Sequence, residues 1–168
     1  AMSATPMALT LLIVDDDPMM RLGLTAALSQ QTDFILVGEA IDGRQGVEQA
    51  SVLKPNIVLM DVGMPGMDGI EATQILKAQF PDMRVVMLTS HTDETEIIAA
   101  LSGGADAYCI KGTDVEALAN AIRVAASGAA YLDPQIAPKV MQNLMPVRPK
   151  AESSEGLLSD REQEVLQI

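Results

Sequence analysis

Short runs of apolar residues alternate with longer amphipathic segments along most of the chain. Five runs rich in aliphatic and β-branched residues predict strands, at residues 9–14, 34–40, 57–60, 84–88 and 107–110. The segments between and after them repeat apolar side chains at helical spacing and predict five helices, at residues 18–30, 43–53, 69–79, 94–101 and 114–126. This alternation predicts a series of βαβ units.

The predicted strands are almost continuously apolar, which is typical of a parallel sheet that helices cover on both faces. The pattern therefore predicts a doubly wound α/β fold, in which ligands bind beyond the carboxyl ends of the strands. The alternation ends after Gly128. Residues 135–144 predict one further amphipathic helix, and Pro146, Pro149 and the polar residues 150–156 predict an exposed linker.

Composition narrows the function classes. A chain of 168 residues allows one domain with a tail but hardly two complete domains, and with 2% aromatic residues its core must be aliphatic. The net charge of −12 makes the chain a poor ligand for nucleic acid, because phosphate contacts need Lys and Arg. No apolar run approaches the roughly 20 residues that span a bilayer, and Cys109 has no second cysteine as partner. We expect a cytoplasmic protein.

Acidic residues stand at the ends of two predicted strands. Asp15, Asp16 and Asp17 follow the first strand, and Asp61 ends the third. Because the carboxyl ends of parallel strands meet at one edge of the sheet, these carboxylates would converge and repel one another unless a cation is present. Mg²⁺ is the ion that such oxygen ligands favour. An aspartate run after a strand is also typical of turns, so the triplet alone leaves that alternative open.

Two phosphate-binding groups stand at the ends of the fourth and fifth predicted strands, at the same edge. Thr89 ends the fourth strand and Lys111 follows the fifth. A hydroxyl and an ammonium group match the oxygens of a phosphoryl group on a neighbouring carboxylate. Each residue alone is also common as a strand-end hydroxyl or a solvated lysine. Together with Asp61 they predict a site at which this aspartate takes up a phosphoryl group.

Four segments of the chain resemble the receiver domain of two-component response regulators, over residues 9–127. These segments are Ile13-Val14-Asp15-Asp16, Val58-Leu59-Met60-Asp61-Val62-Gly63-Met64-Pro65-Gly66-Met67-Asp68-Gly69, Leu88-Thr89-Ser90 and Ile110-Lys111. The resemblance implies a flavodoxin-like, five-stranded parallel sheet of strand order 2-1-3-4-5 with five helices.

The same resemblance implies the roles of the acidic residues. Asp61 would be the phosphoacceptor, and Asp15, Asp16, Asp61 and the backbone carbonyl of Gly63 would hold Mg²⁺. Asp17 would lie outside the metal's ligands. A sensor histidine kinase or a phosphotransfer protein would donate the phosphoryl group. The chain would then be no enzyme in the ordinary sense, since it catalyses only its own phosphorylation and dephosphorylation.

Further residues would transmit the signal or tune its lifetime. Thr89 and Lys111 would bind the phosphoryl oxygens, and Thr89 and Tyr108 would form the conformational switch, although Tyr108 as a plain aromatic residue remains an alternative. His91 would tune the access of water. Gly112 departs from the family pattern, because many receivers have proline after the lysine, often with a cis peptide.

The C-terminal residues resemble the opening of a LuxR-type (NarL/FixJ-class) helix-turn-helix domain. The segment is Leu158-Ser159-Asp160-Arg161-Glu162-Gln163-Glu164-Val165-Leu166, in which Ser159 and Glu162 form a capping box. We therefore expect a truncated transcription regulator, with a receiver at 8–128, a linker containing a short helix at 129–156 and the start of the DNA-binding domain at 157–168. DNA would bind only through the missing part of that domain, and phosphorylation could drive homodimer formation.

Two other function classes remain open from the residues. The spacing Asp15-x-Asp17 also resembles phosphohydrolases of the haloacid dehalogenase type, in which Asp15 would be the nucleophile, but the chain predicts no cap domain. An interaction module that works without phosphorylation is the third class. Neither accounts for the acids, hydroxyl and lysine together.

Overall fold

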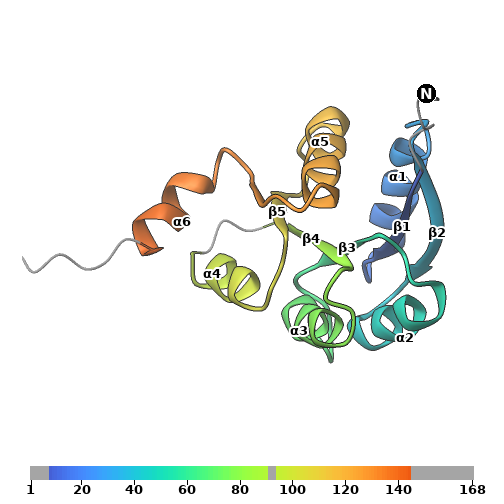
Figure 1. Ribbon diagram of the computed structural model, residues 1–168, viewed down its shortest axis with the longest axis horizontal. Coiled ribbons are helices and arrows are strands. Elements are labelled where there is room, and N and C mark those ends of the chain that lie inside the picture. The colour runs from blue at the N-terminus through green and yellow to red at the C-terminus, as the bar shows by residue number, and fades with distance from the viewer. Residues whose placement is uncertain (1–7, 91–93, 145–168) are drawn as a thin grey trace, which may run out of the picture. The chain divides into compact units, whose positions relative to one another are not determined.

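The computed structural model describes residues 8–90 and 94–144. Their strands form one parallel sheet in the order β2-β1-β3-β4-β5-β6 (Figure 1). The strands are β1 (Leu9–Val14), β2 (Phe34–Ala40), β3 (Ile57–Asp61), β4 (Arg84–Thr89), β5 (Ala107–Ile110) and β6 (Tyr131–Leu132). The predicted α/β class and the order of the first five strands are confirmed.

Helices cover both faces of this sheet (Figure 1). Helices α1 and α5 pack on one face, and α2, α3 and α4 pack on the other. The helices are α1 (Pro18–Leu28), α2 (Gly43–Leu53), α3 (Gly69–Gln79), α4 (Glu94–Ser102), α5 (Val115–Ala126) and α6 (Ala137–Leu144). None of them, within the described ranges, is long and apolar enough to cross a membrane. The five predicted crossover helices and the additional helix near residue 140 are thus present.

The bounds differ from the sequence prediction mainly where polar residues cap a helix. Helix α1 ends at Leu28, two residues before the predicted end, and Ser29 is its C-cap, with its backbone N–H donating to the carbonyl of Thr25. Helix α5 begins at Val115 because Asp114 is its N-cap and accepts a hydrogen bond from the N–H of Ala117.

The core between the sheet and the α1/α5 face is aliphatic, as the composition predicts. Strand β3 lies in the middle of the sheet and all five of its residues are buried. The core residues on the α1/α5 side include Leu11, Leu28, Phe34, Ile57, Leu59, Val86, Leu88, Leu118 and Ile122. Burying such side chains stabilises the fold by roughly 25 cal/mol per Å² of apolar surface.

Strand β6 was not predicted. It pairs with β5, and the N–H of Asp133 donates to the carbonyl of Tyr108 at 3.0 Å. Asp133 is 4% exposed and Ile136 is fully buried. Two residues are too few for an alternating pattern to show, so only the tertiary structure reveals this strand. The described residues divide into two units at residue 137, and the whole sheet lies in the first of them.

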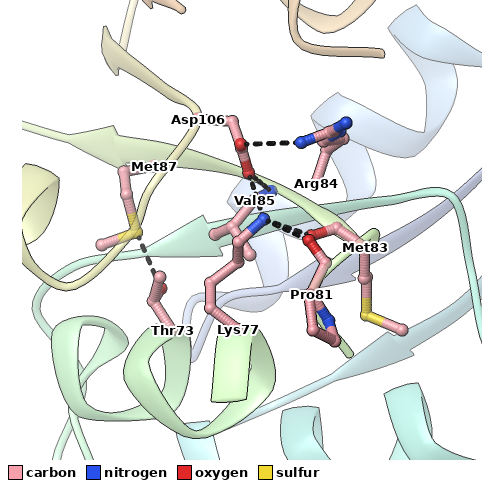
Figure 2. Close-up of polar contacts among 8 residues, drawn as sticks. All are labelled: Thr73, Lys77, Pro81, Met83, Arg84, Val85, Met87 and Asp106. Carbon is pink, nitrogen blue, oxygen red and sulfur yellow. Dashed lines mark hydrogen bonds and ion pairs between the residues drawn. The ribbon is translucent and has the colours of Figure 1, made fainter. Parts of the chain in front are cut away.

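A cluster of charged side chains, Lys77, Arg84 and Asp106, lies at the amino end of β4 (Figure 2). Lys77 Nζ donates to the carbonyls of Pro81 and Met83 at 3.1 and 2.9 Å and to Asp106 Oδ2 at 3.1 Å. Asp106 also accepts the N–H of Val85 at 2.8 Å and Arg84 Nη1 at 3.4 Å. This cluster joins α3, β4 and the turn before β5, at the edge of the sheet opposite the carboxyl ends.

Candidate functional site

Three carboxylates meet at the carboxyl end of the central strands. Asp61 is the last residue of β3, and Asp15 follows β1, whose Val14 pairs with Met60. Asp15, Asp16 and Asp61 offer oxygen atoms that all lie within 4.8 Å of one another. Asp15 and Asp61 are buried, at 1% and 4% exposed, whereas Asp16 is exposed. The fold therefore brings together the aspartates that the sequence predicts.

Lys111 connects this acidic cluster to the neighbouring strands. Its Nζ lies 2.9 Å from Asp61 Oδ1 and 3.1 Å from Asp15 Oδ2. Its backbone N–H donates to the carbonyl of Thr89 at 2.6 Å, which ties the end of β5 to the end of β4. The ammonium group thus stands beside the buried carboxylates rather than in solvent.

Burial and charge set the protonation of this pair. Burial raises the pKa of Asp61 to about 6; Lys111 opposes this effect and the charges of Asp15 and Asp16 add to it. Burial would lower the pKa of Lys111, but the hydrogen bond from Lys111 to Asp61 and the negative charges of Asp61 and Asp15 raise it overall. At neutral pH we therefore expect an ionised Asp61 beside a protonated Lys111.

The arrangement of these oxygens fits a divalent cation. Asp15 Oδ1 accepts the N–H of Asp17 at 2.8 Å, but the buried Oδ2 accepts no hydrogen bond within the described part of the chain. Lys111 lies within ion-pair distance of Oδ2 without the geometry of a hydrogen bond to it. A buried carboxylate oxygen left in this way is costly. A hard cation bound by these carboxylates would satisfy it.

Asp17 has a structural position outside this cluster. It is the N-cap of α1, and its Oδ1 accepts the N–H of Met19 at 2.9 Å. Arg21 in the same helix donates to the carbonyl of Asp15 at 2.7 Å and pairs with Glu39 at 3.1 Å. Of the three aspartates after β1, Asp17 therefore caps a helix, whereas Asp15 and Asp16 belong to the acidic cluster.

The remaining predicted residues lie around the cluster. Thr89, the last residue of β4, is 2% exposed and pairs with Ile110, and Tyr108 is fully buried in β5. Gly63 is exposed, two residues beyond Asp61, and a Cβ there would meet no atom within 4 Å. His91 lies outside the described residues, as does everything beyond residue 144. The roles of these side chains remain predictions.

Gly112 explains one departure from the family pattern. Its φ of 93° lies in the left-handed region, which glycine adopts without strain. Proline is restricted to φ near −65° and cannot take this conformation. The loop after Lys111 therefore has a backbone path that requires glycine.

Gly69 also shapes the site, although in the sequence it stands out only as the last residue of the motif that begins at Val58. A Cβ on Gly69 would collide with the carbonyl oxygen of Asp61 and lie 2.9 Å from its carbonyl carbon. The N–H of Gly69 donates to the carbonyl of Val62 at 2.9 Å. The glycine thus allows α3 to begin directly against the backbone of Asp61.

These features define a receiver domain, and comparison with known proteins agrees. The response regulator receiver domain family matches residues 11–123. The chain therefore belongs to this family of two-component response regulators, and among them to the LuxR/NarL type. It is a response regulator rather than a classical enzyme, so the phosphohydrolase alternative is not supported.

Particular relatives are similar over most of their length. The response regulator VraR of Staphylococcus aureus is 39% identical over 160 residues, which cover 95% of this chain and 75% of that protein. A LuxR-family response regulator from Aurantimonas has a similar structure, with a TM-score of 0.77 and 28% identity over 81% of this chain and 97% of that one. The receiver domain of NarL from Mycobacterium tuberculosis gives a TM-score of 0.70 and 29% identity over 73% and 99%.

Proposed function

We propose that the chain is the phosphorylation-controlled part of a cytoplasmic transcription regulator, and that Asp61 accepts its phosphoryl group. The observation that carries this proposal is the position of Lys111 Nζ, 2.9 Å from Asp61 Oδ1. Asp61 itself lies in a group with Asp15 and Asp16, whose carboxylates each offer an oxygen within 4.8 Å of the others. Such a set offers a nucleophile, a cation site and a fixed positive charge at one point.

The phosphoryl donor is a sensor histidine kinase or a phosphotransfer protein. A carboxylate oxygen of Asp61 attacks the phosphorus of the donor's phosphohistidine, the P–N bond breaks, and the histidine nitrogen keeps the electron pair and takes up a proton. The Asp61 carboxylate is ionised at neutral pH, because its pKa is about 6. Lys111 binds a phosphoryl oxygen and offsets its charge.

Mg²⁺ would be the metal, and the carboxylates of Asp15, Asp16 and Asp61 with the backbone carbonyl of Gly63 would hold it. Such an ion would offset negative charge on the transferred phosphoryl oxygens. Asp15 is held for this task by its own backbone, since its N–H donates to the carbonyl of Ala40 at 3.1 Å. Burial of Asp15 and Asp61 limits the water around the reacting groups.

The output follows from Thr89 and Tyr108. The hydroxyl of Thr89 binds the new phosphoryl group, and Tyr108, which is already fully buried in this structure, holds the adjoining space in the active arrangement. The domains are a receiver at 8–128, a linker at 129–156, and a helix-turn-helix domain that begins at 157. Phosphorylation then promotes homodimer formation, and DNA binds through the helix-turn-helix domain.

Phosphorylation of the chain with acetyl phosphate and Mg²⁺ tests this proposal. We expect one phosphoryl group per chain by intact-mass analysis, and none on Asp61→Asn. Asp17→Asn is the matched control, since Asp17 caps α1 outside the cluster. Lys111→Met should slow phosphorylation by about tenfold or more, because it removes a charge that stabilises the transition state. Equal labelling of Asp61→Asn and the unchanged chain would refute the proposal.

A further inference from the structure

The first turn of α2 lies against the loop that follows Asp61. Gly43, the first residue of α2, is buried. A Cβ on Gly43 would collide with the carbonyl oxygen of Met67 and lie 3.0 Å from Met67 Cγ and 3.1 Å from its carbonyl carbon. Met67 belongs to the loop at residues 62–68 that joins β3 to α3 and contains Gly63. The absence of a side chain at Gly43 therefore allows this close approach.

The same turn also lies against the other strand that leads to the site. A Cβ on Gly46 would lie 2.9 and 3.0 Å from the two methyl carbons of Val14. Val14 is the last residue of β1 and immediately precedes Asp15. Helix α2 thus lies against the residue before Asp15 and against the loop that follows Asp61, although it contributes no side chain to the acidic cluster.

The start of α2 cannot easily move away from the loop. Strand β2, which precedes α2, is hydrogen-bonded to the acidic cluster, because the N–H of Asp15 donates to the carbonyl of Ala40 at 3.1 Å. A reciprocal cap then fixes the first turn. Asp42 accepts the N–H of Gln45 at 2.8 Å, and Gln45 Oε1 accepts the N–H of Ile41 at 2.8 Å. A side chain added at Gly43 would therefore displace the loop rather than the helix.

The ends of that loop are also held. The N–H of Val62 donates to the carbonyl of Leu88 at 3.0 Å, and the N–H of Gly69 donates to the carbonyl of Val62 at 2.9 Å. Only the residues between these ends can absorb a displacement at Met67. Gly63 is exposed with open space around it, and Gly66 has a φ of 74°, so both are points where the backbone can yield.

We propose that Gly43 is a positioning residue for the metal site, because the first turn of α2 sets the path of the loop that carries Gly63. This inference rests on the proposed Mg²⁺ site and adds a residue that touches neither the metal nor the phosphoryl group. Displacing groups that support metal ligands typically weakens metal binding by 10- to 100-fold. A Cβ at Gly43 has this effect by moving the loop.

The test measures Mg²⁺ affinity and stability separately for Gly43→Ala and Gly23→Ala. Gly23 is the matched control, since it is an exposed helical glycine whose added Cβ would meet no atom within 4 Å. Titration with Mg²⁺, followed by amide chemical shifts or calorimetry, gives the Kd; urea unfolding without Mg²⁺ gives the midpoint. We expect a Kd raised about tenfold or more for Gly43→Ala and changed less than about twofold for Gly23→Ala.

Met67→Ala keeps the test decisive if Gly43→Ala does not fold. This substitution shortens the side chain whose Cγ lies 3.0 Å from the place of a Cβ on Gly43, and it loosens the loop. We therefore expect a raised Mg²⁺ Kd, by less than the roughly tenfold expected for Gly43→Ala, with an almost unchanged urea midpoint. If Gly43→Ala folds and its Mg²⁺ Kd is within twofold of that of the unchanged chain, the role of Gly43 is refuted, while the proposed metal site stands. If Gly43→Ala is unfolded, an unchanged Kd for Met67→Ala overturns that role. Absence of Mg²⁺ binding by the unchanged chain refutes the proposed metal site as well.

Discussion

At the scale of single residues, two aspartates respond to folding in opposite directions. Burial raises the pKa of Asp61 from 3.8 to about 6, so the folded chain holds this proton more tightly than the unfolded chain. The hydrogen bond from Arg123 lowers the pKa of Asp33, so folding favours its ionised form. Ionising Asp61 therefore costs stability, whereas ionising Asp33 adds to it.

Replacing Asp61 should accordingly stabilise the metal-free protein at neutral pH. The unfolding free energy of the unchanged chain should fall as the pH rises from about 4 to 6 and then level off, because the folded state loses its extra proton in this window. Asp61→Asn removes this loss. We expect it to be more stable at pH 7 by up to about 3 kcal/mol and equally stable below about pH 4, by urea unfolding with a chelator present.

Asp33→Asn provides the comparison of opposite sign. Its native pKa is lowered, so the stability that its charge contributes is present at neutral pH and is lost as the pH falls through the native pKa. We expect Asp33→Asn to be less stable than the unchanged chain at pH 7, with the difference shrinking in acid. A loss of stability in Asp61→Asn at pH 7 would contradict the assignment of Asp61 as a buried, destabilising charge.

Asp17 should be separable from its two acidic neighbours. Because it caps α1 and accepts the N–H of Met19, Asp17→Ala should lower the unfolding free energy by about 1 kcal/mol, while Asp17→Ser should retain most of the cap. Neither variant should change the Mg²⁺ Kd by more than about twofold. A loss of Mg²⁺ binding as large as that in Asp16→Asn would show that Asp17 belongs to the metal site.

At the scale of elements, charged side chains differ in how much they stabilise the fold. Lys77 Nζ has three oxygen partners, and its side chain is 17% exposed, so it holds α3 to the start of β4 and to the turn before β5 (Figure 2). Arg44 and Glu48 instead form a pair on the surface of α2, with side chains 72% and 58% exposed. Exposed pairs of this kind contribute little, because solvent screens them.

The contrast predicts different costs for two similar substitutions. Lys77→Met leaves Asp106 and two carbonyls without their shared donor and should lower the unfolding free energy by about 2 to 3 kcal/mol. Arg44→Met removes only the exposed pair and should cost less than about 0.5 kcal/mol. Urea unfolding of both variants measures the difference. Equal costs would mean that the cluster at the amino end of β4 contributes no more than a surface ion pair.

Long elements with a regular apolar pattern could be predicted best from the sequence. The strands and helices of the βαβ units were predictable because their apolar periodicity is local and repeats over several residues. Helix ends were less predictable. From the sequence, Asp17 was assigned to an acidic run and Asp114 to the helix at residues 114–126. In the structure, the side chain of each accepts a backbone N–H at the start of a helix. The competition between capping and helix continuation depends on geometry that sequence spacing does not contain.

At the scale of the whole molecule, the sheet extends past α5. Strand β6 adds to the edge of β5, and the segment after it buries Ile136 completely and Asp133 almost completely. Covering an edge strand in this way reduces its tendency to pair with other chains. The sequence pattern predicts that the receiver ends at residue 128, but residues beyond this point contribute to the same sheet.

Ile136→Ala tests this contribution to the core. Because Ile136 is fully buried, the substitution should leave a cavity and lower the unfolding free energy by about 2 to 4 kcal/mol. Met141→Ala is the control, since Met141 in α6 is 62% exposed and its removal should change stability by less than about 0.5 kcal/mol. A negligible effect of Ile136→Ala would mean that the segment after β6 is dispensable for the receiver.

The sequence by itself determined the order of strands and helices and the chemical groups at each strand end. Periodicity is a local property, and parallel strands necessarily bring their carboxyl ends to one edge, so Asp15, Asp61, Thr89 and Lys111 could be assigned to that edge in advance. Only the tertiary structure decided how deeply each carboxylate is buried and which oxygens Lys111 approaches. It also revealed the close contact at Gly43 and the pairing of β6, because both depend on segments that meet only through packing.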